Sequence, residues 1–188
     1  MLKTFTPEEK ERRRKFIGGS DAPVIMKGTH FSKTVKKLWM EKLGKAEEED
    51  LSNKLAVQMG IYTEAFNRKW FTRKTGIKVS RNNCSFLVSR DHEFIGGNLD
   101  GRVTTDDGPG VWEAKHTSSF GKGDIIDTYY AQLQHLMYVT DTGYSIISVL
   151  QDNNKFFWEL VERNQLYIDD LVEKEIEFWS HVTDGTQP

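Results

Sequence analysis

Three residues near the middle of the chain have types and spacing that could do chemistry. Asp100 precedes Gly101, which lets another group approach closely, and Glu113 and Lys115 stand two residues apart. Side chains alternate along a strand, so a strand over residues 110–116 would point Glu113 and Lys115 to one face. If residues 98–105 form the neighbouring strand of a hairpin, Asp100 converges on Glu113.

The chemistry open to such a group is hydrolysis of a phosphodiester. Two carboxylates and a backbone carbonyl make a hard oxygen site suited to Mg²⁺ or Mn²⁺. A lysine alongside can orient or deprotonate water, or neutralise charge that develops on a phosphate. Alone the pattern is weak, because Asp followed by Glu-x-Lys is more often an exposed strand with an ion pair.

Hydrophobic periodicity and turn residues predict the elements that must position these groups. We expect helices over residues 7–15, 34–43, 53–75, 125–140 and 165–182, and strands over residues 77–79, 86–88, 98–105, 110–116, 144–150 and 155–161. Ser20 and Asp21 are good N-cap types for one further short helix. Residues 106–109 predict a hairpin whose loop is longer than two residues. The order predicts an α/β (α+β) fold with a mixed sheet flanked by helices.

The helix expected over residues 53–75 is rich in apolar side chains at helical spacing. Asn53 is placed to open it and Gly76 to end it. Leu55, Met59, Tyr62, Phe66, Trp70 and Phe71 recur along it. We interpret the aromatic residues among them as core rather than as a cofactor site.

Bulk properties bound the class of protein. At 188 residues and 37% hydrophobic composition, we expect one domain spanning residues 1–188. Cys84 is the only cysteine, which excludes an internal disulfide, a four-cysteine zinc site and a cysteine-held iron–sulfur cluster. The net charge of −2 argues mildly against non-specific phosphate binding. No long apolar run or signal layout appears, so we expect a soluble, cytoplasmic protein without a membrane partner.

Five sequence blocks, in order, resemble the PD-(D/E)XK nucleases, specifically the phage lambda exonuclease and YqaJ-type viral recombinase family. The blocks are Arg13 with Ile17 to Asp21, Gly60 to Glu64, Leu99 to Gly101, Glu113 to Lys115, and Tyr129 to Met137. The resemblance covers nearly the whole chain. It implies a restriction-endonuclease-like core.

The resemblance also implies roles for the central residues. Asp100 and Glu113, with the Ala114 carbonyl, would hold Mg²⁺, for which Mn²⁺ can substitute, and Lys115 would be the catalytic lysine. Glu64 would lie near the metal and hold a second ion directly or through water, so that the site takes one or two ions.

Two residues of the last helical block are expected beside this centre. The family places a glutamine equivalent to Gln132 next to the catalytic lysine and the scissile phosphate. Tyr129 lies three residues earlier, hence on the same helix face, and is expected to contact DNA.

Arg13 and Ser20 are implied to hold the 5′-phosphate of the strand being degraded. The residue types agree with this role, since an arginine offers a bidentate phosphate fork and a hydroxyl with free amides at a helix start attracts anions. Arg12 and Arg14 flank Arg13, so the choice among the three arginines stays open.

The resemblance implies an activity and an assembly. We expect a Mg²⁺-dependent 5′-to-3′ exonuclease that digests one strand of linear double-stranded DNA and leaves a 3′ overhang for recombination by single-strand annealing. A ring-shaped homotrimer, a single-strand annealing protein as partner, and a phage or mobile-element origin in a bacterial cell are implied with it. The alternatives are a structure-specific or restriction-type endonuclease on the same core, and a catalytically silent DNA-end-binding protein.

Overall fold

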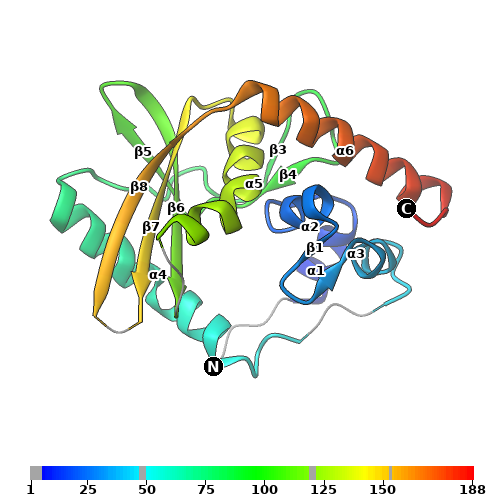
Figure 1. The fold of residues 1–188 in the computed structure, drawn as a ribbon, viewed down its shortest axis with the longest axis horizontal. Helices are drawn as coiled ribbons and strands as arrows, with labels where there is room; N and C mark the ends of the chain where they lie inside the picture. The colour runs from blue at the N-terminus through cyan, green and yellow to red at the C-terminus, as the bar shows by residue number, and fades with distance from the viewer. Residues whose placement is uncertain (1–5, 47–49, 119–121, 153) are drawn as a thin grey trace.

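A four-stranded mixed sheet forms one side of the computed structural model shown in Figure 1. The structure describes residues 6–46, 50–118, 122–152 and 154–188. The strands are β5 (Gly101–Thr105), β6 (Gly108–Thr117), β7 (Tyr144–Gln151) and β8 (Lys155–Glu162). They lie in the order β5-β6-β7-β8, with β6 and β7 parallel and the two outer pairs antiparallel. The predicted α/β fold with a mixed sheet is confirmed.

Two helices cover the two faces of the sheet. Parallel neighbours cannot be joined by a tight turn, so α5 (Lys122–Thr140) carries the chain from β6 back to the start of β7. Ile147 of β7 packs in the core beneath α5. On the opposite face, Trp112 packs against Phe71 of α4 (Leu55–Thr75). Side chains that alternate with Trp112 along β6 therefore face α5.

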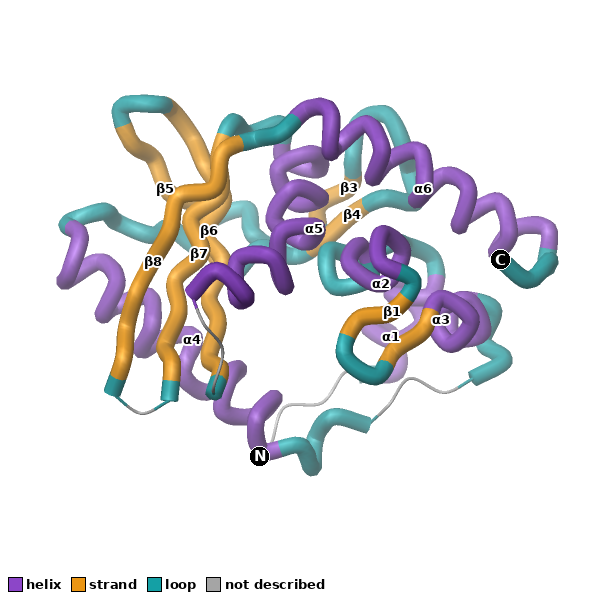
Figure 2. Tube along the Cα trace, viewed as in Figure 1, coloured by secondary structure: helices purple, strands orange, loops and turns teal. Residues whose placement is uncertain are grey.

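The remaining elements pack beside α5, away from β8 (Figure 2). They are α1 (Pro7–Arg14), α2 (Ala22–Lys27), α3 (Val35–Lys42) and α6 (Gln165–Asp184), with the short strands β1 (Thr29–His30), β2 (Lys33–Thr34), β3 (Leu87–Val88) and β4 (Gly96–Gly97). A second core joins Ile17 and Leu38 to Phe178 of α6. The indole N–H of Trp39 also donates to the His181 carbonyl at 3.0 Å. The N-terminal helices are thus fixed to the last helix. Within the described residues, no helix has the length and hydropathy needed to span a membrane.

The strand predictions were wrong in three places. Residues 77–79 form no strand, because Val79 packs against Gly101 outside the sheet and only Ser80 forms an isolated bridge with Arg102. Strand β5 starts at Gly101 rather than at residue 98, since the Leu99 amide donates to the Cys84 carbonyl instead. The hairpin loop is also shorter than predicted, because Thr105 pairs with Gly108 and leaves only residues 106 and 107 between them.

The prediction that the aromatic residues of α4 are core was wrong in part. Phe71 is fully buried, but Leu55, Tyr62 and Phe66 are 75%, 85% and 53% exposed. The helix begins after Lys54 rather than Asn53, and no side chain caps it. Only the face of α4 that packs on β6 is covered. The apolar residues of this helix therefore lie on two faces, one buried and one exposed.

A buried ion pair ties α5 to α6. His135 Nδ1 lies 2.7 Å from Glu175 Oε1, and His135 Nε2 lies 2.9 Å from the Gly96 carbonyl oxygen. Both side chains are fully buried. Burial alone would lower the pKa of His135, but the Glu175 carboxylate and the two acceptors outweigh it and raise the pKa above its ordinary value of 6.5.

This pair predicts that stability falls on the alkaline side. A histidine whose pKa is raised by folding contributes fully below its unfolded-state value and loses that contribution as pH rises through the folded-state value. We therefore expect the temperature of thermal unfolding to decrease above about pH 6.5, which is the ordinary histidine value. Thermal unfolding monitored by circular dichroism from pH 6 to pH 9 checks this. A variant without the pair, His135→Leu/Glu175→Leu, should show a flatter profile, and an equally steep one contradicts the assignment.

Candidate active site

The structure brings Asp100 and Glu113 together at the start of the β5–β6 hairpin. The register pairs Gly101 with Trp112, which puts Asp100 opposite Glu113 across the two chain segments. The Asp100 carboxylate accepts the amide N–H of Ala114 at 2.9 Å. A Cβ at Gly101 would collide with the Val79 side chain, so a glycine is required where these backbones approach.

Glu113, Lys115 and Gln132 form a closed triangle of hydrogen bonds. The Lys115 ammonium donates to Glu113 Oε1 at 2.8 Å and to Gln132 Oε1 at 3.2 Å. The Gln132 amide in turn donates to Glu113 Oε1 at 2.6 Å. The Lys115 ammonium also lies 4.4 Å from the centre of the Tyr129 ring, a cation–π contact. Residues of β6 and α5 therefore hold the lysine in one position.

The protonation of this triangle depends on burial and on neighbouring charge. Burial and the negative charge of Asp100 raise the pKa of Glu113 to about 7, although Lys115 opposes the shift. Burial would lower the pKa of Lys115, but the charges of Glu113 and Asp100 outweigh it and raise the pKa above its ordinary value. Two carboxyl groups thus share one ammonium, and a divalent cation bound between them would reduce their mutual repulsion.

The donor chemistry fits a hard divalent cation. Asp100 and Glu113 supply carboxylate oxygens, and no histidine or cysteine side chain joins them among the cavity-lining residues. Within the described parts of the chain, no three His, Cys, Asp or Glu side chains cluster closely enough to hold a metal by themselves. Any further protein ligand would have to be of another kind, such as the Ala114 carbonyl implied by the family resemblance.

Glu64 is not part of a three-carboxylate cluster in this structure. It projects from α4 and forms an ion pair with Arg81. Its charge still reaches the centre, since it contributes to the raised pKa of Glu113. The role expected for Glu64 near a second ion stays a prediction.

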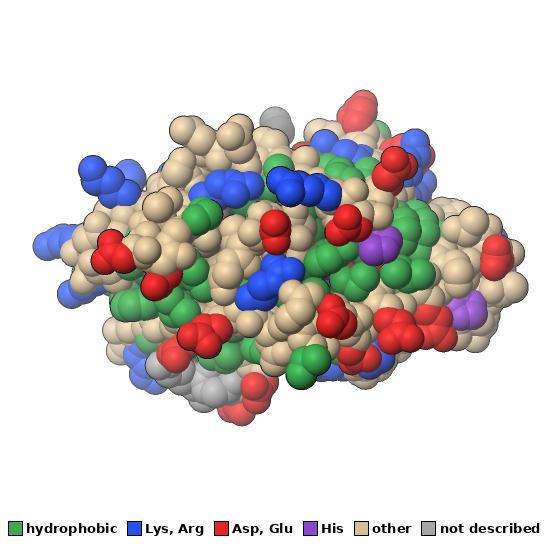
Figure 3. All heavy atoms as spheres, turned by 90° about the horizontal axis from the view of Figure 1, so that it is seen from above, with side chains coloured by type: hydrophobic (Ala, Val, Ile, Leu, Met, Phe, Trp, Pro, Cys, Tyr) green, Lys and Arg blue, Asp and Glu red, His purple; other side chains and the backbone are tan. Residues whose placement is uncertain are grey.

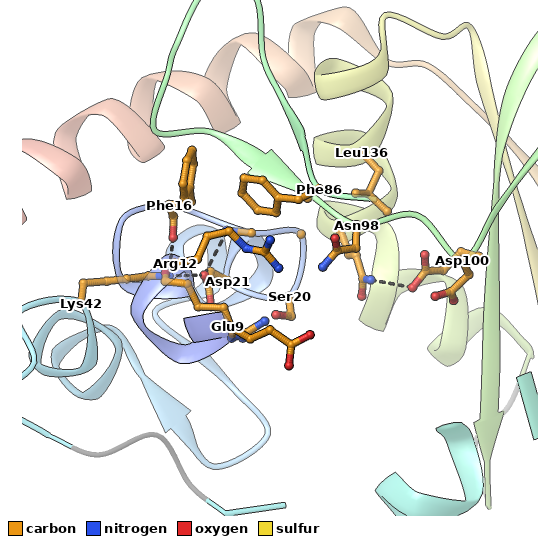
Figure 4. Close-up of a pocket in the computed structure, with 16 residues that line it drawn as sticks. Glu9, Arg12, Phe16, Ser20, Asp21, Lys42, Phe86, Asn98, Asp100 and Leu136 are labelled. Carbon is orange, nitrogen blue, oxygen red and sulfur yellow. Dashed lines mark hydrogen bonds and ion pairs between the residues drawn. The ribbon is translucent and has the colours of Figure 1, made fainter. Parts of the chain in front are cut away.

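One cavity of about 170 Å³ connects this centre to the residues expected to bind a 5′-phosphate (Figure 4). Arg12 and Ser20 lie on one side of it and Asp100 on the other. The lining residues are Glu9, Arg12, Arg13, Phe16, Gly18, Gly19, Ser20, Asp21, Lys42, Phe86, Gly97, Asn98, Asp100, Glu113, Gln132 and Leu136. Two groups of residues about a hundred positions apart in sequence thus share one space.

The cavity narrows the choice among the three arginines that could hold a 5′-phosphate. Arg12 and Arg13 both line it, and the Arg12 guanidinium lies over the Phe86 ring at 5.0 Å. Arg14 is not among the lining residues and forms an ion pair with Glu11 at 3.5 Å.

The loop before α2 differs from the simple helix start that the sequence predicted. Asp21 occupies the N-cap position, but its carboxylate caps no amide of the helix. Instead it accepts the Gly18 amide at 3.0 Å, and its own amide donates to the Gly18 carbonyl at 2.8 Å. Pro23 has no N–H to offer. Fewer free amides are therefore available at this turn than the sequence predicted.

Sequence reasoning missed several residues of the cavity. Lys42, Phe86 and Asn98 line it without belonging to any recognised block. Lys42 carried one usable signal, because it follows the buried Leu38 by four residues and so falls on the apolar face of its helix. The other two come from irregular segments whose position the sequence does not determine.

Gln132 offers a direct test of the triangle. Replacing it with leucine removes both contacts that hold Lys115 and Glu113, so we expect turnover on linear duplex DNA to fall about 10- to 100-fold. Thr128→Ala, on the same helix but bonded only to the Asp124 carbonyl, should keep the original rate. An unchanged rate for Gln132→Leu would show that the amide has no part in the reaction.

Comparisons with known proteins agree with the overall fold. Solved structures with a similar fold include an alkaline exonuclease from Laribacter hongkongensis, with a TM-score of 0.71 and 18% identity over 96% of this chain and 94% of that one. A phage related exonuclease from Haemophilus somnus 129PT has a TM-score of 0.67 and 14% identity over 89% and 93% of the two chains.

Sequence comparison identifies the family. The chain is 33% identical over 182 residues to the uncharacterized protein YqaJ of Bacillus subtilis (strain 168), covering 93% of this chain and 56% of that protein. It thus spans little more than half the length of that relative. Residues 10–144 match the YqaJ-like viral recombinase domain, which includes Asp100, Glu113, Lys115 and Gln132. The chain belongs to the YqaJ-like viral recombinase family.

Proposed function

We propose that this chain is a Mg²⁺-dependent exonuclease that digests the 5′-ended strand of linear double-stranded DNA and leaves a 3′ overhang for recombination by single-strand annealing. The observation that carries the proposal is the shared cavity, in which Arg12, Arg13 and Ser20 face Asp100 and Glu113. A strand end whose phosphate is held at the first group would present an internal phosphodiester to the second. The fold likeness to exonucleases and the family membership support it.

Each residue of the centre has a role in this reaction. Asp100 and Glu113, with the Ala114 carbonyl, would hold Mg²⁺, which would supply positive charge and polarise the phosphate. The charges of Glu113 and Asp100 raise the pKa of Lys115 above its ordinary value, which favours the ammonium form suited to orient water and neutralise developing negative charge. Gln132 keeps Lys115 in place.

Three substrates decide between this activity and its rivals. Linear duplexes with 5′-phosphate ends, linear duplexes with 5′-hydroxyl ends and closed circles are incubated with Mg²⁺ or with EDTA. We expect fastest digestion of the phosphorylated linear duplex, resistance of the circles and no digestion in EDTA. Equal cutting of circles would indicate an endonuclease, and binding of ends without digestion would indicate a silent end-binding protein.

We further propose a ring-shaped homotrimer with a single-strand annealing protein as partner, in a bacterial cell that carries a phage or mobile element. Acidic and basic side chains are interspersed on the face of the molecule in Figure 3. This face therefore offers no broad basic surface for binding the DNA backbone. The exposed side chains of α4, including Leu55 and Tyr62, are apolar surface that a second copy could cover. Multi-angle light scattering tests the assembly, and a monomer at micromolar concentration would contradict it.

A further inference from the structure

A buried ion pair lies directly behind the arginine side of the cavity. The Lys42 ammonium of α3 lies 2.7 Å from Asp21 Oδ2, and the two side chains are only 5% and 3% exposed. Both residues contribute to the cavity lining, together with Arg13 and Ser20 (Figure 4). A lysine and an aspartate this deeply buried are stable only as a pair.

All three donors of the Lys42 ammonium are used within the protein. Besides Asp21, the ammonium donates to the Arg13 carbonyl at 2.9 Å and to the Phe16 carbonyl. An ammonium group has three N–H donors and no acceptor. Lys42 therefore has no donor left for a phosphate, even though it lies at the wall of the cavity.

Asp21 links the ion pair to the turn at Gly18. Its Oδ2 accepts the Gly18 amide at 3.0 Å in addition to the Lys42 ammonium. Burial would raise the pKa of Asp21, but the positive charges of Lys42, Arg13 and Lys33 outweigh it and hold the pKa well below its ordinary value. The pair thus joins the end of α1, the turn at Gly18 and helix α3 through contacts made by two side chains.

We propose that Lys42 and Asp21 are positioning residues that set the distance between the arginines of α1 and Ser20, and so determine the preference for a phosphorylated 5′ end. The inference rests on the proposed function. Arg13 is attached through its own carbonyl to Lys42, whereas Ser20 follows directly from the turn that Asp21 fastens. A buried pair replaced by apolar groups often keeps a fold stable, so loss of the pair should affect this spacing more than folding.

The test uses the double variant Asp21→Asn/Lys42→Met, which removes both charges and keeps the volume close to the original. Fluorescence anisotropy in EDTA gives the Kd for duplex ends that differ only in a 5′-phosphate or a 5′-hydroxyl. We expect a preference for the phosphorylated end of at least about tenfold in the unaltered protein. The double variant should lose most of that preference. Lys36→Met is the matched control, because it removes an exposed lysine from the same helix and should keep the preference.

The outcomes separate the two claims. No preference in the unaltered protein would overturn the proposed function, whereas an unchanged preference in the folded double variant would overturn the positioning role alone. Should the double variant fail to fold, Lys42→Arg decides. A guanidinium keeps the charge but cannot place three donors on the same three oxygens, so a reduced preference is expected there and an unchanged one overturns the inference.

Discussion

Glu113→Gln is expected to lower the rate of Mg²⁺-dependent DNA degradation by about 10³-fold or more, because it removes a charged oxygen ligand from the centre of the reaction. Glutamine has nearly the same shape and can still accept the Lys115 hydrogen bond. The loss should therefore come from the missing charge rather than from rearranged packing. Degradation of a linear duplex with 5′-phosphate ends, followed at saturating Mg²⁺, measures it.

A matched change elsewhere controls for net charge. Asp107→Asn alters an exposed carboxylate in the β5–β6 turn and should leave the rate as it was. Burial and the charge of Asp100 disfavour an ionised Glu113, so a neutral glutamine in its place should not destabilise the protein. Thermal unfolding without metal should therefore show that Glu113→Gln is folded. Undiminished Mg²⁺-dependent degradation by Glu113→Gln would refute the assignment of Glu113 as a metal ligand.

The largest expected effect on stability comes from the pair between α5 and α6. Glu175→Leu leaves the His135 imidazolium buried without its anion, which should cost about 3–5 kcal/mol. For a chain of this size that corresponds to a decrease of about 6–20 °C in the unfolding temperature. Differential scanning calorimetry at pH 6, where His135 is protonated in the intact protein, measures it.

The double variant separates pairing from packing. His135→Leu/Glu175→Leu removes both charges, so it should recover part of the loss even though the Gly96 carbonyl loses its partner. The single variant His135→Leu completes the cycle, and because Glu175 Oε2 already has no hydrogen-bond partner in its buried site, no second bond compensates there for the missing histidine. A double variant as unstable as the sum of the two single variants would show that the two residues are not coupled.

The convergence of Asp100, Glu113 and Lys115 could be predicted because these residues are close in sequence and obey a simple period. Glu113 and Lys115 share a face through strand alternation, and a hairpin brings Asp100 to them. Gln132 follows from the crossover helix that a parallel strand pair requires. Local rules thus predicted the grouping of Asp100, Glu113 and Lys115, and the family resemblance added Gln132.

The wall of the cavity could not be predicted in the same way. The spacing of Lys42 from Leu38 places it on the apolar face of its helix, but nothing in the sequence indicates that its partner is Asp21. The exposed apolar side of α4 was misread for a related reason. Helical spacing shows that apolar residues share a face, but only the tertiary arrangement shows whether another element covers it.

The residues that line the shared cavity also fall into two sequence segments that can be substituted separately. Asp100, Glu113, Lys115 and Gln132, which would cut, lie late in the chain, whereas the arginines of α1 and Ser20, which would hold a 5′-phosphate, lie before Lys45. The two parts meet at Gly19, where a Cβ would come within 3.3 Å of both Gln132 and Leu136. A side chain at this one position would act as a spacer between them. Gly19 therefore fixes how closely the two groups of residues approach each other.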